Sequence, residues 1–329
     1  MSDAPLRFGI LGAARIAPMA LVRPARQVEG AQVVAVAARD PDRARRFATR
    51  HGVPRVHGSY AALLADPEVD AVYNPLPNAL HAEWTVRALE AGKHVLCEKP
   101  LASNAAEAAR MADAARAAGR RLVEAFHWRY HPLAARMLAI VAGGELGPVR
   151  HLETELVIPL VLPRDIRWRL DLAGGATMDV GCYTIHMLRS LAGAEPEVVS
   201  ARARELGAGV DRTMDAELRF ADGRTGRIRC GLLSARIFRA RARVVGERAT
   251  LEVTNPLAPH FFHRLRVRST AGARRERVPG RATYVHQLEA FVDAVRAGTP
   301  LPTDPADAVA NMRVIDAVYD AAGLARRGA

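Results

Sequence analysis

The chain has little lysine and little cysteine. Lys93 and Lys99 are the only lysines in its 329 residues, although lysine and arginine together number 47. The three cysteines, Cys97, Cys182 and Cys230, form no Cys-x-x-Cys pair, which disfavours a metal knuckle or a disulfide framework. We therefore expect no metal and three reduced thiols; a catalytic thiol is the alternative, because Cys97 and Cys182 flank the motifs described below.

Long apolar runs are also missing, since none reaches the ~18–20 residues that a membrane span needs. The N-terminus lacks the order of basic, apolar and small residues that marks a signal peptide. We expect a cytoplasmic protein without a membrane partner. The net charge of +12 comes from arginines interleaved with acids, without a basic helix or an aromatic RNA-binding motif. Solvated surface arginine without a nucleic-acid partner is the expectation, and an anion-binding face is the alternative.

The length favours two domains, and the pattern of apolar and polar residues changes after Ala125. Before that point, apolar runs alternate with helical patterns, which predicts a parallel sheet of βαβ units. The strands are expected at 7–11, 32–38, 71–73, 94–97 and 122–125, and the helices from Ala14 onward and at 42–50, 81–91 and 104–118. The sequence predicts an α/β fold with a domain boundary at 125/126.

Residues 126–329 show alternating segments separated by turn signals such as Asp222-Gly223. Strands are expected at 151–157, 198–204, 216–220, 225–230 and 241–245, followed by helices at 284–296 and 305–322. This pattern predicts an α+β domain with a mostly antiparallel open sheet.

A glycine-poor version of the dinucleotide fingerprint follows the first strand. Gly12-Ala13-Ala14-Arg15-Ile16-Ala17 matches G-x-G-x-x-G/A except at Ala14, whose methyl group narrows the approach of a pyrophosphate. The motif predicts a Rossmann domain over residues 1–125, with Gly12, Ala14, Arg15 and Ile16 at the cofactor. Tight packing at a strand–helix junction is the alternative.

The end of the second strand indicates which dinucleotide binds. NAD enzymes usually carry an acidic residue there, whereas this chain reads Ala38-Arg39-Asp40. Arg39 and Arg43 can pair with a ribose 2′-phosphate, which favours NADP over NAD. In the alternative, Asp40 binds the ribose and Arg39 points to solvent.

The fourth strand ends in Cys97-Glu98-Lys99-Pro100. Ligands of an open parallel sheet bind beyond the carboxyl ends of its strands, so Lys99 is expected where a nicotinamide and its substrate meet. A charged lysine there can polarise a substrate hydroxyl or carbonyl. A lysine retained in so lysine-poor a chain is itself suggestive of chemistry.

A second cluster follows Gly174-Gly175 in the second domain. Asp179 and Tyr183 are four residues apart, so a helix would place them on one face, with His186 three residues further. A carboxylate, a phenol and an imidazole together are suited to acid–base chemistry. Taken singly, each is more often an ordinary core or surface residue.

Three elements together resemble the glucose–fructose oxidoreductase / inositol dehydrogenase / rhizopine catabolism (Gfo/Idh/MocA) family over nearly the whole chain. They are the fingerprint, Glu98-Lys99-Pro100, and Gly174-Gly175-x-x-x-Asp179-x-Gly181-x-Tyr183. Within the family the chain is most similar to the dihydrodiol dehydrogenase, xylose dehydrogenase and sugar 3-ketoreductase branch. That closeness rests on Ala37-Ala38-Arg39-Asp40, Pro75-Leu76-Pro77-Asn78-x-x-His81 and Arg129-Tyr130-His131-Pro132.

The resemblance implies Lys99 and Tyr183 as the catalytic pair, with Asp179 orienting substrate hydroxyls or Lys99. Lys99 would lower the pKa of the phenol from its ordinary ~10. Trp168 is expected near the nicotinamide, and Asp165 and Arg167 in the same loop near the substrate. The remaining cofactor residues implied are Pro75, Leu76, Asn78, His81 and Glu98, and the remaining substrate residues are Arg129 and His186.

The predicted function is NADP(H)-dependent oxidation or reduction of a sugar, keto sugar or cyclic diol, in a homodimer or homotetramer formed through the C-terminal sheet. One rival is a glycosidase that holds NAD tightly, but relatives of that kind usually carry histidine at the Tyr183 position. A second rival is a non-catalytic NADPH-binding sensor, which the intact Lys99 and Tyr183 disfavour. A third is an enzyme for nucleotide-linked or protein-bound substrates, in which surface arginines grip phosphate.

Overall fold

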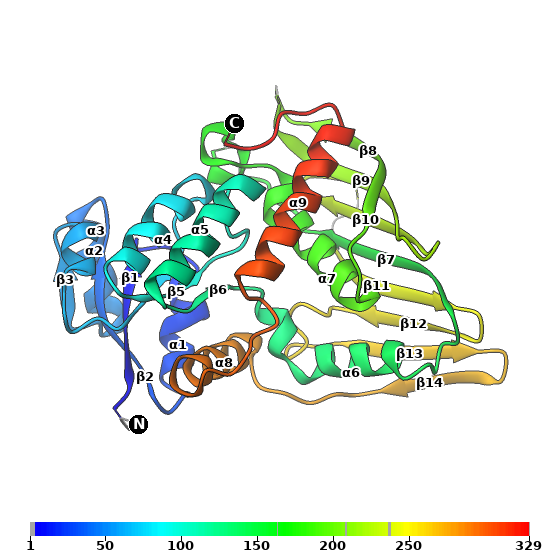
Figure 1. The fold of residues 1–329 in the computed structure, drawn as a ribbon, viewed down its shortest axis with the longest axis horizontal. Helices are drawn as coiled ribbons and strands as arrows, with labels where there is room; N and C mark the ends of the chain where they lie inside the picture. The colour runs from blue at the N-terminus through cyan, green and yellow to red at the C-terminus, as the bar shows by residue number, and fades with distance from the viewer. Residues whose placement is uncertain (1–3, 163, 208, 236–237, 329) are drawn as a thin grey trace. The chain divides into compact units, whose positions relative to one another are not determined.

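The computed structural model describes residues 4–162, 164–207, 209–235 and 238–328, in two compact units (Figure 1). The first unit comprises Met1–His127 and Tyr284–Val309, and the second comprises Trp128–Thr283 and Ala310–Ala329. The sequence predicts a single boundary after residue 125. In the structure the first crossing lies between His127 and Trp128, and the chain also returns to the first unit at Tyr284 and leaves it again after Val309.

The first unit contains a six-stranded parallel sheet in the order β3-β2-β1-β4-β5-β6 (Figure 1). Its strands are β1 (Leu6–Leu11), β2 (Ala31–Ala37), β3 (Arg55–His57), β4 (Ala71–Asn74), β5 (His94–Cys97) and β6 (Leu122–Glu124). The strand order reverses between β1 and β4, and dinucleotides bind at such a switch point in doubly wound sheets. The predicted Rossmann sheet is therefore confirmed.

Helices cover both faces of this sheet. They are η1 (Pro18–Val22), α1 (Arg23–Ala25), α2 (Pro41–His51), α3 (Tyr60–Leu64), η2 (Asn78–Leu80), α4 (His81–Glu90), α5 (Ala105–Ala118) and α8 (Thr283–Ala297). The ring of Phe8 lies 5.6 Å from that of Phe291 in α8, whereas a Cβ on the next residue, Gly9, would lie 2.6 Å from Leu63 in α3. Successive residues of β1 thus point to opposite faces, and each face has its own helical cover.

Local sequence signals account for where these helices begin and end. Asp40 accepts from the amides at the start of α2, Pro41 opens the helix, and Gly52 closes it in the left-handed region. The helix expected from Ala14 onward was placed too early. Residues 14–16 form a turn in which Ala17 N donates to Ala14 O (3.2 Å), and the helical segment then begins with the π-helical turn η1.

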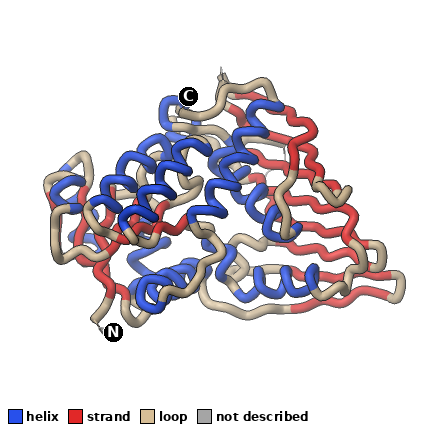
Figure 2. Tube along the Cα trace, viewed as in Figure 1, coloured by secondary structure: helices blue, strands red, loops and turns tan. Residues whose placement is uncertain are grey.

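The second unit contains an eight-stranded sheet in the order β14-β13-β12-β11-β7-β10-β9-β8, drawn side by side in Figure 2. Its strands are β7 (Val149–Val157), β8 (Glu197–Glu205), β9 (Asp211–Arg219), β10 (Thr225–Gly231), β11 (Arg239–Gly246), β12 (Ala249–Thr254), β13 (Arg264–Ser269) and β14 (Gly272–Glu276). Every neighbouring pair is antiparallel except β7 and β10. The mostly antiparallel sheet is therefore confirmed, although β12, β13 and β14 were not among the predicted strands.

One face of the second sheet packs against α7 (Cys182–Ala192), which contacts β7, β10 and β11. The other helical segments are η3 (His127–Tyr130), α6 (Pro132–Ala142), η4 (Ile166–Trp168), η5 (Leu170–Leu172), η6 (Thr177–Gly181) and α9 (Pro305–Ala321). Over the residues that the structure describes, no helix combines the length and apolar character that crossing a membrane requires.

Candidate active site

The loop after β1 carries the dinucleotide fingerprint. Gly12 has φ +92°, a conformation that favours glycine, and a Cβ there would lie 3.0 Å from Leu76 Cδ2, so Leu76 would also have to shift slightly. Ala14 N donates to Gly12 O (2.9 Å), which places the methyl-bearing residue inside a tight turn. Ala14 and Ile16 are half-exposed and Arg15 is exposed, while Ala17 is fully buried where the fingerprint requires close packing. The loop thus forms a tight turn directly after β1, and contact of Ala14 with a pyrophosphate stays a prediction.

Two exposed arginines follow β2, and the carboxylate between them is engaged with the backbone. Asp40 Oδ1 accepts from Asp42 N (2.9 Å) and Arg43 N (3.3 Å), as an N-cap does. Arg43 Nη2 donates to Ala13 O (3.2 Å) in the fingerprint loop. No carboxylate of the described residues pairs with Arg39 or Arg43. This arrangement suits a 2′-phosphate better than a ribose held by Asp40.

An aromatic pair that the sequence did not single out lies beside this loop. The rings of Tyr60 and Trp84 meet edge to face with centroids 4.9 Å apart. The Tyr60 hydroxyl lies 3.8 Å from where a Cβ on Gly12 would sit, and it interacts with the backbone of Arg39. Burial raises the pKa of Tyr60. The spacing of Tyr60 and Trp84 in the sequence gives no signal that they lie beside the fingerprint loop.

Two buried polar side chains, Asn74 and His81, contact the loop after β4. Asn74 Nδ2 donates to Thr85 Oγ1 (3.1 Å), and its Oδ1 accepts from Leu76 N (3.3 Å). The two ring nitrogens of His81 lie 2.9 Å from Pro100 O and 2.8 Å from Leu76 O, and the side chain has no exposed surface. His81 is therefore buried between the loops that follow β4 and β5, and its role toward a cofactor stays a prediction. Asn74 was missed by sequence reasoning.

Other expected cofactor residues lie along the same edge of the sheet. Pro75 is buried directly after β4, and Asn78 is a half-exposed residue that opens η2. Glu98, directly after β5, accepts from the Tyr73 hydroxyl at Oε1 (2.6 Å) and from Lys99 N at Oε2 (3.3 Å). The carboxylate of Glu98 therefore holds the backbone from which Lys99 projects. The Lys99 side chain is half-exposed, and the Lys99–Pro100 peptide is cis.

The other lysine has a structural role. Lys93 Nζ donates to Asp66 O (2.8 Å) and Val69 O (2.7 Å), which closes the loop that leads into β4. Burial lowers the pKa of Lys93. Scarcity alone therefore does not mark a lysine as catalytic, and only Lys99 follows a strand at the ligand-binding edge.

In the second unit, the two glycines of the second motif make a turn without room for side chains. A Cβ on Gly174 would lie 2.5 Å from Arg167 O and 2.7 Å from Arg169 O. Gly175 has φ +129°, and a Cβ there would lie 2.1 Å from Asp211 Oδ1. Position 174 requires glycine because of the close approach, and position 175 also because of its conformation.

Gly174→Ala is expected to lower the free energy of unfolding by ~1–3 kcal/mol, because backbone carbonyls rather than flexible side chains oppose the new methyl group. Chemical denaturation measures the change. Gly58→Ala is the matched control, since nothing lies within 4 Å of its Cβ position. Equal stabilities of the two variants would contradict this account of the turn.

Three charged residues that the sequence proposed for the site are brought together here. Arg167 Nε lies 2.9 Å from Asp179 Oδ2, and Arg167 Nη1 lies 3.0 Å from Asp165 Oδ1. Asp165 also accepts from Arg167 N (3.1 Å), and its side chain is only 1% exposed. The nearby Asp179 charge is the largest cause that raises the pKa of Arg167. Arg167 thereby fixes one oxygen edge of Asp179.

The residues of the proposed acid–base group do not lie on one continuous α-helix. Asp179 lies in the π-helical turn η6, whereas Tyr183 is a buried residue in the first turn of α7. His186 is fully buried, and its Nδ1 accepts from the Trp128 indole (3.0 Å), so its ring proton resides on Nε2. Contact of His186 with a substrate stays a prediction.

Two further expected residues lie in short helical turns. Trp168 is half-exposed in η4, and its indole donates to Leu162 O (3.1 Å), which holds the loop that carries Asp165. Arg129 is half-exposed in η3. Their roles toward nicotinamide and substrate stay predictions.

A buried ion pair between Asp211 and Arg327, which the sequence did not predict, packs against the turn at Gly174 and Gly175 and stabilises it. Asp211 Oδ1 lies 2.9 Å from Arg327 Nη2, and both side chains are 0% exposed. Asp211 Oδ2 accepts from Thr177 N and Thr177 Oγ1, each at 2.7 Å. Arg327 Nε donates to Gly174 O (2.8 Å). The last residues of the chain thus hold the turn that precedes Asp179.

Comparison with known proteins agrees with this architecture. A family model described as "Oxidoreductase family, NAD-binding Rossmann fold" matches residues 6–126, and one described as "GFO/IDH/MocA C-terminal domain" matches residues 134–252. The chain belongs to the GFO/IDH/MocA oxidoreductase family.

Relatives that are named for sugar substrates match nearly the whole chain. D-Xylose 1-dehydrogenase (NADP(+)) 2 of Haloferax volcanii is 37% identical over 96% of this chain and 97% of its own. The dTDP-3,4-didehydro-2,6-dideoxy-alpha-D-glucose 3-reductase of Streptomyces violaceoruber is 37% identical over 98% of this chain and 96% of its own. The structure of KijD10, a 3-ketoreductase from Actinomadura kijaniata in complex with NADP and TDP-benzene, has a TM-score of 0.91 at 32% identity, and the match covers 96% of this chain and 98% of that chain. The branch expected from the motifs is confirmed.

Proposed function

We propose that this oxidoreductase uses NADP(H) to interconvert a secondary alcohol and a ketone on a sugar, a keto sugar or a cyclic diol. The observation that carries the proposal is the placement of Lys99 two residues after β5, at the carboxyl edge of a sheet whose order reverses beside the fingerprint loop. Tyr183 and the oriented Asp179 are the partners proposed from the second unit.

The chain's own residues would bind the cofactor and move one proton. NADP, when bound, supplies the position that accepts or gives a hydride. Tyr183 donates its hydroxyl proton to the substrate oxygen during reduction and takes it back during oxidation. The Lys99 ammonium favours the phenolate form of Tyr183 and polarises the substrate oxygen. Asp179, fixed by Arg167, accepts hydrogen bonds from substrate hydroxyls.

Replacing Arg39 and Arg43 by serine is expected to raise the Kd for NADP ~10²–10⁴-fold while the Kd for NAD changes little. Each substitution removes a guanidinium and with it a charge-assisted hydrogen bond to the 2′-phosphate, a contribution of ~1.5–3 kcal/mol to the binding free energy. Titration calorimetry with both nucleotides measures the effect. Arg46→Ser is the matched control, because Arg46 is also an exposed arginine of α2. Equal loss of affinity for both nucleotides would contradict the role given to the two arginines.

The substrate class rests on the relatives, which are named for D-xylose and for dTDP-linked keto sugars. A thermal-shift comparison of NADP⁺ and NAD⁺, followed by a panel of sugars, keto sugars and diols with the preferred cofactor, tests the proposal. Turnover of at least one panel member with NADP(H) is expected. Stabilisation by NAD⁺ alone, or cofactor that co-purifies and is never turned over, would contradict it.

Association of two or four copies through the second sheet and a cytoplasmic location stay predictions. Light scattering of the purified chain tests the first.

A further inference from the structure

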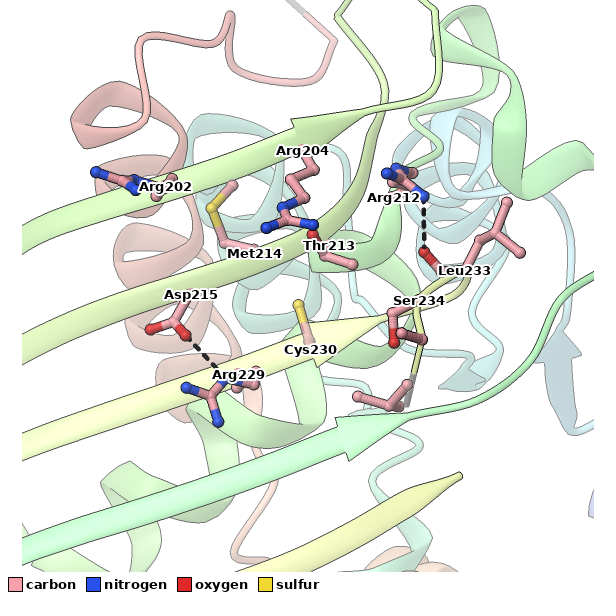
Figure 3. A pocket seen from close by; sticks show the side chains of 12 residues that line it. Arg202, Arg204, Arg212, Thr213, Met214, Asp215, Arg229, Cys230, Leu233 and Ser234 are labelled. Carbon is pink, nitrogen blue, oxygen red and sulfur yellow. Dashed lines mark hydrogen bonds and ion pairs between the residues drawn. The ribbon is translucent and has the colours of Figure 1, made fainter. Parts of the chain in front are cut away.

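Thr154 in β7 points to the face of the second sheet that α7 covers. In register it lies beside Ile228 of β10, which has no exposed surface. The next residue of β7, Glu155, lies beside Arg229. Arg229 pairs with Asp215 on the opposite, charged face of the sheet (Figure 3). Because successive residues of a strand point to opposite faces, the buried Thr154 side chain is directed at the helix.

The peptide groups on both sides of Tyr183 accept hydrogen bonds from side chains of other elements. Thr154 Oγ1 of β7 donates to the carbonyl oxygen of Thr184 (2.8 Å), the residue after Tyr183. Asn311 Nδ2 of α9 donates to the carbonyl oxygen of Cys182 (3.3 Å), the residue before it. A helical carbonyl has a second lone pair, so it can accept such a bond in addition to the bond within its helix. Two elements distant in sequence therefore hold the backbone of Tyr183.

Asn311 is oriented for this contact by Arg189 of α7. Arg189 Nη1 donates to Asn311 Oδ1 (3.3 Å), and a guanidinium can only donate, so it selects the amide oxygen. The amide nitrogen of Asn311 is thereby directed to Cys182 O. Glu195 fixes Arg189 in turn, since its carboxylate oxygens accept from Nε and Nη2 at 2.7 Å each. Asn311 has no exposed surface, and hydrogen bonds in such surroundings are stronger than in water.

The helical turn that leads into α7 is wide. Cys182 N donates to Thr177 O, five residues back, so η6 is a π-helical turn rather than an α-helical one. Turns of this kind are rare and occur frequently at functional sites. Asp179 O also accepts from Cys182 Sγ (3.6 Å). Gly181 O accepts from Thr184 Oγ1 (2.8 Å). The position of the first turn of α7 therefore depends on side-chain contacts as well as on the helix itself.

We propose that Thr154 and Asn311 are positioning residues that set the place of the Tyr183 hydroxyl. The inference rests on the proposed function, in which that hydroxyl exchanges a proton with the substrate oxygen. The hydroxyl lies at the far end of a rigid ring, so a small shift of the Tyr183 backbone is carried to it. A misplacement of ~1 Å can slow a positioned reaction ~10²-fold. Thr154 and Asn311 act only through the backbone of Tyr183 and do not touch the reacting atoms.

Thr154→Val and Asn311→Leu remove the two donors and keep the approximate size of the side chains. Each is expected to lower kcat at least ~10-fold while the Kd for NADP changes little, because the phenol and not the cofactor is displaced. Tyrosine labelled with ¹³C at the ring Cζ gives a readout that is independent of turnover, recorded by NMR on the NADP⁺-saturated full chain. The Tyr183 signal, identified by its loss in Tyr183→Phe, is expected to shift in both variants.

Thr154→Ser is the conservative variant, which keeps the hydroxyl and should restore the Tyr183 signal and kcat to nearly those of the unaltered protein. Thr225→Val is the matched control, because it removes a threonine hydroxyl that donates to Arg150 O (3.5 Å) at an exposed position of the same sheet. It should change neither readout.

An unshifted Tyr183 signal in Thr154→Val or in Asn311→Leu, with the variant folded by circular dichroism, would overturn the role given to that residue. An equal shift in Thr225→Val would overturn the proposal as a whole. A shifted signal with normal kcat would uphold the positioning of Tyr183 and exclude the proposed role of Tyr183 in proton transfer instead.

Discussion

Tyr183→Phe is expected to lower kcat by ~10²–10⁴-fold, the usual contribution of a positioned acid–base group. Phenylalanine keeps the ring that packs in the first turn of α7 and removes only the hydroxyl. The Kd for NADP and the melting temperature should therefore stay close to those of the unaltered protein. Steady-state kinetics with the best substrate of the panel gives kcat and KM separately.

Lys99→Met should act on the same step and lower kcat to a similar extent. Lys93→Met is the control, because Lys93 is the only other lysine of the chain. Lys93→Met removes two hydrogen bonds to backbone carbonyls, so it should lower the melting temperature while the kcat of folded enzyme is retained. Near-normal kcat in both Tyr183→Phe and Lys99→Met, with cofactor bound normally, would exclude them as the catalytic pair.

Arg327→Met has the second large expected effect, a loss of ~3–5 kcal/mol in the free energy of unfolding. The substitution leaves the Asp211 carboxylate buried beside Tyr319 without its cationic partner. It also removes the hydrogen bond to Gly174 O and the guanidinium that stacks 4.1 Å from the Tyr319 ring. Chemical denaturation followed by circular dichroism measures the loss.

Arg326→Met is the matched control for this prediction. The neighbouring Arg326 pairs with Asp320 at the surface, where the side chains are 53% and 48% exposed, so its removal should change stability little. The double variant Asp211→Asn with Arg327→Met should recover part of the loss, because it no longer buries an unpaired charge. Equal stabilities of the Arg326 and Arg327 variants would show that the buried pair does not brace the glycine turn.

Most strands and helices of the first unit could be predicted because they carry a local signal. The strands are continuous apolar runs, and the helices α2 and α5 begin at Asp40 and Asn104 and end at glycines in the left-handed region. Strand β3 lacks such a signal, since Arg55–His57 contains no buried residue. It forms only because β2 offers it an edge.

The later strands of the second sheet were missed for two different reasons. In β12, Ala249, Leu251 and Val253 are buried alternately, so the period-2 signal exists and could have been used. In β14, Gly272–Glu276, no side chain is buried, and the strand is defined by pairing with β13 alone. Its formation depends on a neighbour that local sequence does not specify.

The residues of the candidate site also fall into two groups, those that the sequence predicted and those that only the structure revealed. Motifs predicted roles for Gly12 and Lys99, because phosphate loops and strand ends place chemistry at known points of a doubly wound fold. The role of Tyr183 was predicted from the resemblance to the family. The groups that hold these residues in place are long-range contacts: Asp211 with Arg327 is one of them, 116 residues apart. No spacing rule joins positions so distant, so the supporting residues required the structure.

Direct hydride transfer is the central claim, and isotope tracing tests it. NADPH deuterated at nicotinamide C4 is incubated with the enzyme and the keto-sugar panel, and the products are analysed by mass spectrometry. The account predicts one deuterium on the carbinol carbon of a product alcohol, with equimolar NADP⁺, and loss of that product in Tyr183→Phe. Consumption of a sugar substrate without net NADPH oxidation and without retained deuterium would contradict it.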